Sequence, residues 1–141
     1  MSRYTKDYQM NYDIDWFFTD GIHYFHVASN GGAIPDFVNV DRNSNIELQN
    51  RIANSKIVTN DINVIDNPNG FNYSSFVDFA KKGFISIDKK NDGFDSQNYF
   101  VVAEPSNKQI KPDGVDDLIP KLSEKNRFKI HIEDIRNELL W

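Results

Sequence analysis

Two histidines three residues apart, followed by two adjacent glycines, are the residues of this sequence whose types and spacing could do chemistry. They lie in the stretch TDGIHYFHVASNGGAIP, residues 19–35. On a helix, His23 and His26 would have the spacing of a metal-chelating pair, and the backbone amides of Gly31 and Gly32 could hold an anion. Which of these chemistries is open depends on the elements that position the residues.

The segment around Asp20-Gly21 predicts a β-hairpin. Two runs of aromatic and β-branched residues flank this dipeptide, which is typical of a two-residue type I′ turn because both central residues need positive φ. The expected register is Thr19–Ile22, Phe18–His23, Phe17–Tyr24, Trp16–Phe25, Asp15–His26 and Ile14–Val27. His23 and His26 then lie on opposite faces of one strand, so they cannot bind the same ion, and we expect no metal site.

Asp15 and His26 face one another in this register and are weak candidates for catalysis. A carboxylate beside an imidazole can orient it as a general base. A hydrolase also needs a nucleophile, and Ser29 is not surrounded by the Gly-x-Ser-x-Gly pattern of a nucleophile elbow. The favoured interpretation is a cross-strand hydrogen bond or salt bridge.

Gly31 and Gly32 are candidate anion-binding residues in the same scheme. Phosphate-binding loops carry further glycines or a lysine and run directly into a helix, whereas here Pro35 and Asp36 follow. The glycines therefore predict the exit from a strand, where positive φ is needed.

Phe17 and Tyr24 share the more polar face of the predicted hairpin. They are either buried under a helix or exposed in a patch that binds a protein or a small ligand. Burial in a core is the commoner fate of such residues. The exposed alternative makes them candidate binding residues.

The composition bounds the class of protein. A chain of 141 residues predicts one domain, residues 1–141, with residues 1–11 as a candidate flexible tail. The absence of cysteine excludes disulfides, thiolate metal sites and thiol nucleophiles, and we expect no cofactor. A net charge of −5 disfavours nucleic acid, no apolar run reaches the length of a membrane span, and the expected location is the cytoplasm.

Helices and strands are predicted in mixed order along the rest of the chain. The sequence predicts a helix near 45–54 with a capping box from Ser44 to Glu47, a weak strand within 56–66, a helix from Asn72 to Gly83, strands at 84–88 and 99–104, a helical turn at 116–122, a strand at 127–132 and a closing helix through Ile132, Ile135 and Leu139. This order predicts the α+β class, with a mainly antiparallel sheet built from hairpins and packed by two or three short helices.

Three stretches resemble a set of small uncharacterised bacterial proteins. The shared features are Asp15-Trp16-Phe17 with Asp20-Gly21, Phe25, Asn30-Gly31-Gly32 and Pro35; Phe76 to Phe84 with Asp88; and Tyr99 to Pro105. The resemblance spans roughly residues 13–122 and implies a shared fold. It implies no catalytic residue, and it implies an origin among paralogues of the sort sometimes seen at toxin–immunity loci.

The function expected from the sequence is protein binding without catalysis, in an immunity-like bacterial protein. The acidic charge suits a basic partner such as a toxin. Two alternatives remain: a small hydrolase that uses Asp15 and His26, and a small-ligand module that uses the aromatic face of the hairpin.

Overall fold

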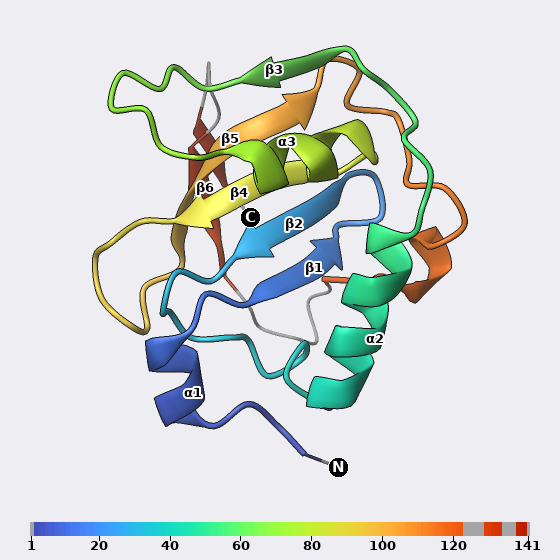
Figure 1. Ribbon diagram of the computed structural model, residues 1–141. Coiled ribbons are helices and arrows are strands. Elements are labelled where there is room, and N and C mark those ends of the chain that lie inside the picture. The colour runs from blue at the N-terminus through green and yellow to red at the C-terminus, as the bar shows by residue number, and fades with distance from the viewer. Residues whose placement is uncertain (1, 123–128, 134–137, 141) are drawn as a thin grey trace.

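One mixed β-sheet flanked by helices forms the centre of the molecule (Figure 1). The structure is a computed structural model that describes residues 2–122, 129–133 and 138–140. Its elements are α1 (Lys6–Asn11), β1 (Asp15–Thr19), β2 (Tyr24–Ala28), α2 (Arg42–Ala53), β3 (Ile62–Val64), α3 (Ser74–Lys81), β4 (Ile85–Lys89), β5 (Asn98–Pro105), the 3-10 helix η1 (Asp116–Leu118), β6 (His131–Glu133) and β7 (Glu138–Leu140).

The strands lie in the order β1-β2-β4-β5-β6-β7, and β3 pairs with the end of β5. β2 with β4 and β5 with β6 run parallel, whereas the other pairings are antiparallel. The predicted α+β class is confirmed, and the sheet is mixed rather than built from antiparallel hairpins alone. The parallel pairing of β2 with β4 matters most for function, because it brings residues some 60 positions apart onto one face.

The first hairpin closes through a four-residue turn, not the predicted two-residue turn. Thr19 pairs with Tyr24, and the Asp20 carboxylate accepts hydrogen bonds from the backbone amides of Ile22 and His23 at 2.8 and 2.6 Å. These side-chain bonds make the wider turn an Asx-type turn, which competes with the type I′ geometry. The predicted register is therefore wrong by two residues, and because the strand period is two, every strand residue keeps its predicted face.

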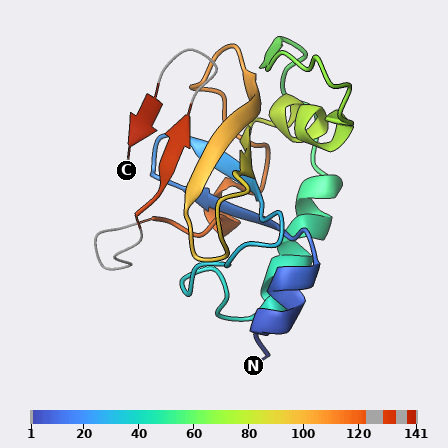
Figure 2. The same ribbon diagram turned by 90° about the vertical axis from the view of Figure 1, so that its left-hand side faces the viewer.

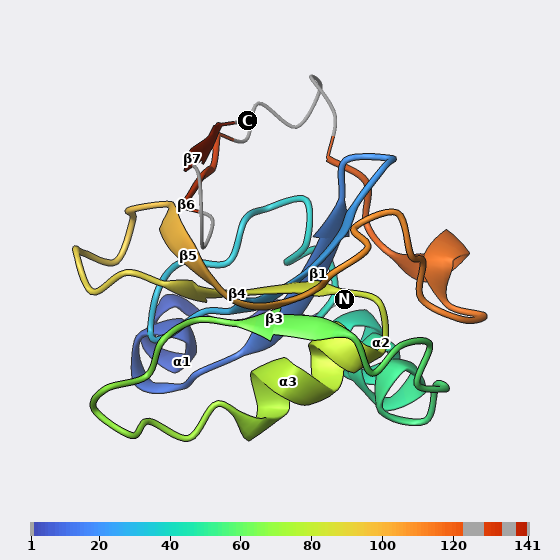
Figure 3. The same ribbon diagram turned by 90° about the horizontal axis from the view of Figure 1, so that it is seen from above.

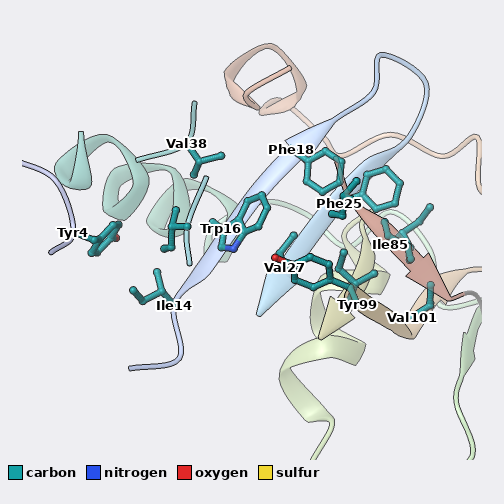
Figure 4. Packing of buried hydrophobic residues seen from close by; sticks show 14 residues of the cluster. Tyr4, Ile14, Trp16, Phe18, Phe25, Val27, Val38, Ile85, Tyr99 and Val101 are labelled. Atoms are coloured by element: carbon teal, nitrogen blue, oxygen red, sulfur yellow. The ribbon is translucent and has the colours of Figure 1, made fainter. Parts of the chain in front are cut away.

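One face of the hairpin forms the larger core (Figure 4). Trp16, Phe18, Phe25 and Val27 are fully buried there, and the rings of Phe18 and Phe25 stack with centroids 4.6 Å apart. The members that cover this face from outside the sheet include Tyr4, Ile14, Ile34, Val38 and Ile130. The alternating pattern of β1 and β2 thus supplies an apolar layer to this side.

The opposite face of the hairpin lies under α2 and α3 (Figure 3). Phe17 is fully buried and Tyr24 is 8% exposed, and both contact a cluster that includes Leu48 and Ile52 of α2. Phe79 of α3 meets Phe17 edge-on at 5.6 Å. Phe17 and Tyr24 are therefore core residues, and the alternative of an exposed patch at these two positions does not hold.

Residues before β1 are part of the packed structure. Residues 6–11 form α1, Tyr4 is 5% exposed, and the Gln9 amide donates to the Tyr4 carbonyl at 2.9 Å. The candidate flexible tail is thus held on the domain, because an apolar ring and a buried amide anchor it.

The two longer helices differ in how they begin. α2 begins at Arg42, three residues earlier than predicted, because Asp41 rather than Ser44 caps it by accepting from the Asn43 amide. α3 begins at Ser74, and its N-cap residue is Tyr73 and not the predicted Asn72; the Asn72 side chain instead accepts from the Ser74 amide at 3.1 Å in an Asx turn ahead of the helix. None of the helices in the described ranges combines the length and apolar character that a bilayer crossing requires.

The C-terminal segment adds strands instead of the predicted closing helix. Ile132 of β6 pairs with Leu139 of β7 in an antiparallel ladder, and Figure 2 shows these last two strands, in red, side by side. Ile135 and residues 127–128 lie outside the described residues. The helix prediction is wrong at Ile132 and Leu139, where the pairing of β6 with β5 and of β7 with β6 outweighs a weak helical spacing.

Candidate functional site

Asp15, His26 and Ser86 form a hydrogen-bonded cluster across β1, β2 and β4. His26 Nε2 lies 2.7 Å from Asp15 Oδ1, and His26 Nδ1 lies 2.6 Å from Ser86 Oγ. The contact expected between Asp15 and His26 is present, now between diagonal rather than facing residues, since Asp15 pairs with Ala28. The sequence does not indicate that Ser86 belongs to this cluster, because only the parallel pairing of β2 with β4 places it opposite His26.

The cluster has the residue types of a hydrolase triad but is closed to substrate. Ser86 is fully buried and His26 is 1% exposed. The imidazole also stacks on the ring of Phe79 with centroids 3.8 Å apart, and Phe76 lies beside it. A nucleophile must reach a substrate carbon, and this hydroxyl cannot. The cluster therefore links three strands beneath α3.

Gly31 and Gly32 form a filled turn and not an anion cradle. Asn30 and Gly31 have φ of 47° and 73°, as the predicted strand exit requires. The Gly32 amide donates to the Ser29 carbonyl at 2.8 Å, and a Cβ on Gly32 would lie 2.2 Å from Cδ of Lys89. The Gly32 amide is thus already bonded within the turn, and the stem of Lys89 packs against this glycine.

An open cleft of about 560 Å³ lies beyond the end of β4. Its lining combines two carboxylates, Asp13 and Asp88, with four aromatic rings and three asparagine amides: Phe71, Tyr73, Phe76, Phe100, Asn30, Asn72 and Asn91. The topology assembles it, because the parallel strands β2 and β4 end at the same edge of the sheet, where β1 begins. Its volume lies in the range typical of ligand sites.

The negative charges of the two carboxylates in the cleft are not balanced by an ion pair with a positive side chain among the described residues. Burial, followed by the nearby charge of Asp13, raises the pKa of Asp88 from an ordinary value near 3.8 to about 7, although the backbone amide of Lys89 donates to it. Lys89 and Lys90 also line the cleft, but their ammonium groups bind elsewhere: Lys89 Nζ lies 3.1 Å from Asp92 Oδ1, and Lys90 Nζ pairs with Glu133. In the described ranges, no ion pair includes Asp13 or Asp88.

Phe71 stands at the rim of the cleft on a locked turn. The side chain of Asn67 bonds both backbone groups of Phe71: its Oδ1 accepts from the Phe71 amide at 2.9 Å, and its Nδ2 donates to the Phe71 carbonyl at 2.6 Å. The Gly70 amide closes the turn onto the Asn67 carbonyl. Phe71 is nevertheless 60% exposed. Nothing in the sequence indicates that Asn67 holds Phe71.

No metal centre is visible in the part of the chain that the structure describes, because nowhere there do three His, Cys, Asp or Glu side chains come together. Models of known protein families, curated protein sequences and solved structures give no match to this chain. Two features therefore bear on function: the closed cluster around His26 and the open cleft around Asp88.

Proposed function

We propose that this chain is a non-enzymatic cytoplasmic domain that binds another protein, in the manner of an immunity protein, through the surface around Phe71. The observation that carries the proposal is the exposed ring of Phe71, which two hydrogen bonds from Asn67 hold at the rim of an open cleft. Aromatic anchors are enriched in protein interfaces, and a rigid turn reduces the entropy that binding costs.

The charge of the chain favours a basic partner. The net charge is −5, and the cleft beside Phe71 holds two carboxylates without a lysine or arginine partner in the described residues. An acidic surface speeds encounter with a basic protein and disfavours acidic competitors. A toxin with a basic surface, such as a nuclease, fits this description.

The hydrolase alternative has little support from the geometry, since the hydroxyl of Ser86 is buried beneath α3. The small-ligand alternative is favoured by one observation, the volume of about 560 Å³ in the cleft. It would use Phe71 and Asp88 and not the predicted face of Phe17 and Tyr24.

Replacing Phe71 by alanine is expected to weaken partner binding at least about tenfold, because the exposed anchor is lost while the fold is untouched. The partner is captured on the tagged protein from the native cell, identified by mass spectrometry and purified. The dissociation constant of the purified pair is then measured by calorimetry for both forms.

The matched control is Leu118→Ala, which removes an exposed apolar side chain of η1 on the opposite side of the molecule (Figures 1 and 3). This variant should bind as tightly as the unaltered protein. Equal affinities for Phe71→Ala and the unaltered protein would rule out the proposed surface.

A further inference from the structure

The cleft beside Phe71 has the chemistry of a receptor for one positively charged side chain. Asp13 accepts a hydrogen bond from the Asn30 amide at 2.9 Å with one carboxylate oxygen, Oδ1. Asp88 accepts one from the Lys89 amide. Carboxylates can accept more bonds than this, so both retain acceptor capacity toward a cation.

The lysines of the cleft do not supply that cation. Lys89 is 3% exposed, and its ammonium group donates to the Lys90 carbonyl at 2.8 Å and to Asp92. The ammonium group of Lys90 donates to Glu133 of β6. Each lysine is thus neutralised at the edge of the cleft, and the unmatched charge within it is negative. This charge disfavours phosphate and other anions as occupants.

The aromatic walls distinguish among cations. Tyr73 lies between Phe71 and Phe76, with ring centroids 6.2 and 5.7 Å away. A planar guanidinium stacks on such rings and donates to carboxylates in a fork, whereas an ammonium group is compact and strongly hydrated. A divalent metal ion is less favoured, because among the described residues no three His, Cys, Asp or Glu side chains come together, here or elsewhere.

We propose that the cleft receives the guanidinium group of an arginine that the partner protein presents, with Asp13 and Asp88 binding its N–H groups and the aromatic wall formed by Phe71 and Tyr73 stacking against one side of its plane. This inference rests on the proposed function, because it assigns the partner its anchoring residue. The arginine side chain enters past Phe71, whose locked turn keeps the rim open.

The test uses three blocked pentapeptides that differ only at the central position: Gly-Gly-Arg-Gly-Gly, the same peptide with lysine, and the same peptide with citrulline, the uncharged counterpart of arginine. Each is titrated into the isotope-labelled full chain and followed by NMR. The arginine peptide should bind in the millimolar range, shift the amide signals of residues 71–73 and 88–91, and bind at least about tenfold more tightly than the citrulline peptide. The affinity of the lysine peptide should lie between those of the arginine and citrulline peptides.

The variants Asp88→Asn and Asp13→Asn should each weaken arginine binding about threefold to tenfold, because each removes a charged acceptor. Asp95→Asn, which alters an exposed carboxylate in the turn after β4, should leave it unchanged. Equal binding of the arginine and citrulline peptides, or shifts away from the cleft, would overturn the inference.

Failure of this inference and failure of the proposed function are distinguishable. If the purified partner depends on Phe71 while no peptide binds, the arginine assignment is overturned and the protein-binding surface stands. If the arginine peptide binds through Asp88 while Phe71→Ala leaves the affinity for the partner unchanged, the cleft is a small-ligand site and the proposed protein interface is overturned.

Discussion

Replacing His26 by alanine is expected to lower the free energy of unfolding by about 3–4 kcal/mol, the largest effect of any change considered for this protein. The substitution removes a ring stacked on Phe79 at 3.8 Å and leaves the buried hydroxyl of Ser86 without its imidazole partner. The cavity and the unsatisfied polar group each lower the free energy of unfolding. Chemical denaturation monitored by tryptophan fluorescence measures the change.

The neighbouring histidine provides the matched control. His23 lies in the turn of the same hairpin and has a side chain that is 30% exposed; its imidazole lies 3.4 Å from the carboxylate of Asp20 and meets the edge of Phe25 with ring centroids 6.4 Å apart. His23→Ala should therefore cost less than about 1 kcal/mol. Equal losses for the two variants would contradict a structural role for the Asp15–His26–Ser86 cluster, as would an esterase activity that disappears in Ser86→Ala.

Replacing Asp88 by asparagine is expected to stabilise the protein near neutral pH by roughly 2 kcal/mol, relative to the effect of the same substitution at pH 4. This value is smaller than the full pKa shift of Asp88 would give, because the carboxylate is partly exposed and solvent screens its charge. The pKa of Asp88 is raised to about 7 in the folded state, so the folded state binds this proton more tightly than the unfolded state. The stabilising contribution of the protonated Asp88 is complete below about pH 4 and is lost as the pH rises through 7. Asparagine has no such loss.

The measurement is the difference in unfolding free energy between Asp88→Asn and the unaltered protein, taken from pH 4 to pH 8. It should grow with pH across this window. Asp92→Asn should instead give a difference that is nearly constant from pH 4 to pH 8, because hydrogen bonds from Asn98 and Ser96 and the ion pair with Lys89 hold the pKa of Asp92 at about 2, so that its stabilising contribution is lost only below about pH 4. If the difference in unfolding free energy for Asp88→Asn does not change with pH, burial and the charge of Asp13 do not raise the pKa of Asp88.

Local pattern predicts the inner layers of this fold well. The alternation of β1 and β2 assigns Trp16 and Phe18 to one face and Phe17 and His26 to the other, and these assignments survive a turn that is two residues wider than predicted. They survive because a shift of two residues preserves every face. The helix that follows Asn72 and the strands β4 and β5 also follow from their apolar periods.

The candidate site could not be predicted to the same extent, because non-local pairing assembles it. Asp88 and Ser86 reach the hairpin only through the parallel ladder between β2 and β4, and the two strands are separated by two helices and β3 along the chain. The hydrogen bonds from Asn67 to Phe71 depend on side-chain geometry that composition does not encode. Asp13 is visible in the sequence only as one acidic residue among many.

The most direct test of the account is the hydrogen-exchange footprint of the purified partner on this chain. If the surface around Phe71 binds the partner, complex formation should slow exchange at residues 67–73 and 88–91 and leave α2 and η1 unchanged. Protection centred on α2 and η1, with residues 67–73 exchanging as in the free protein, would contradict the central claim.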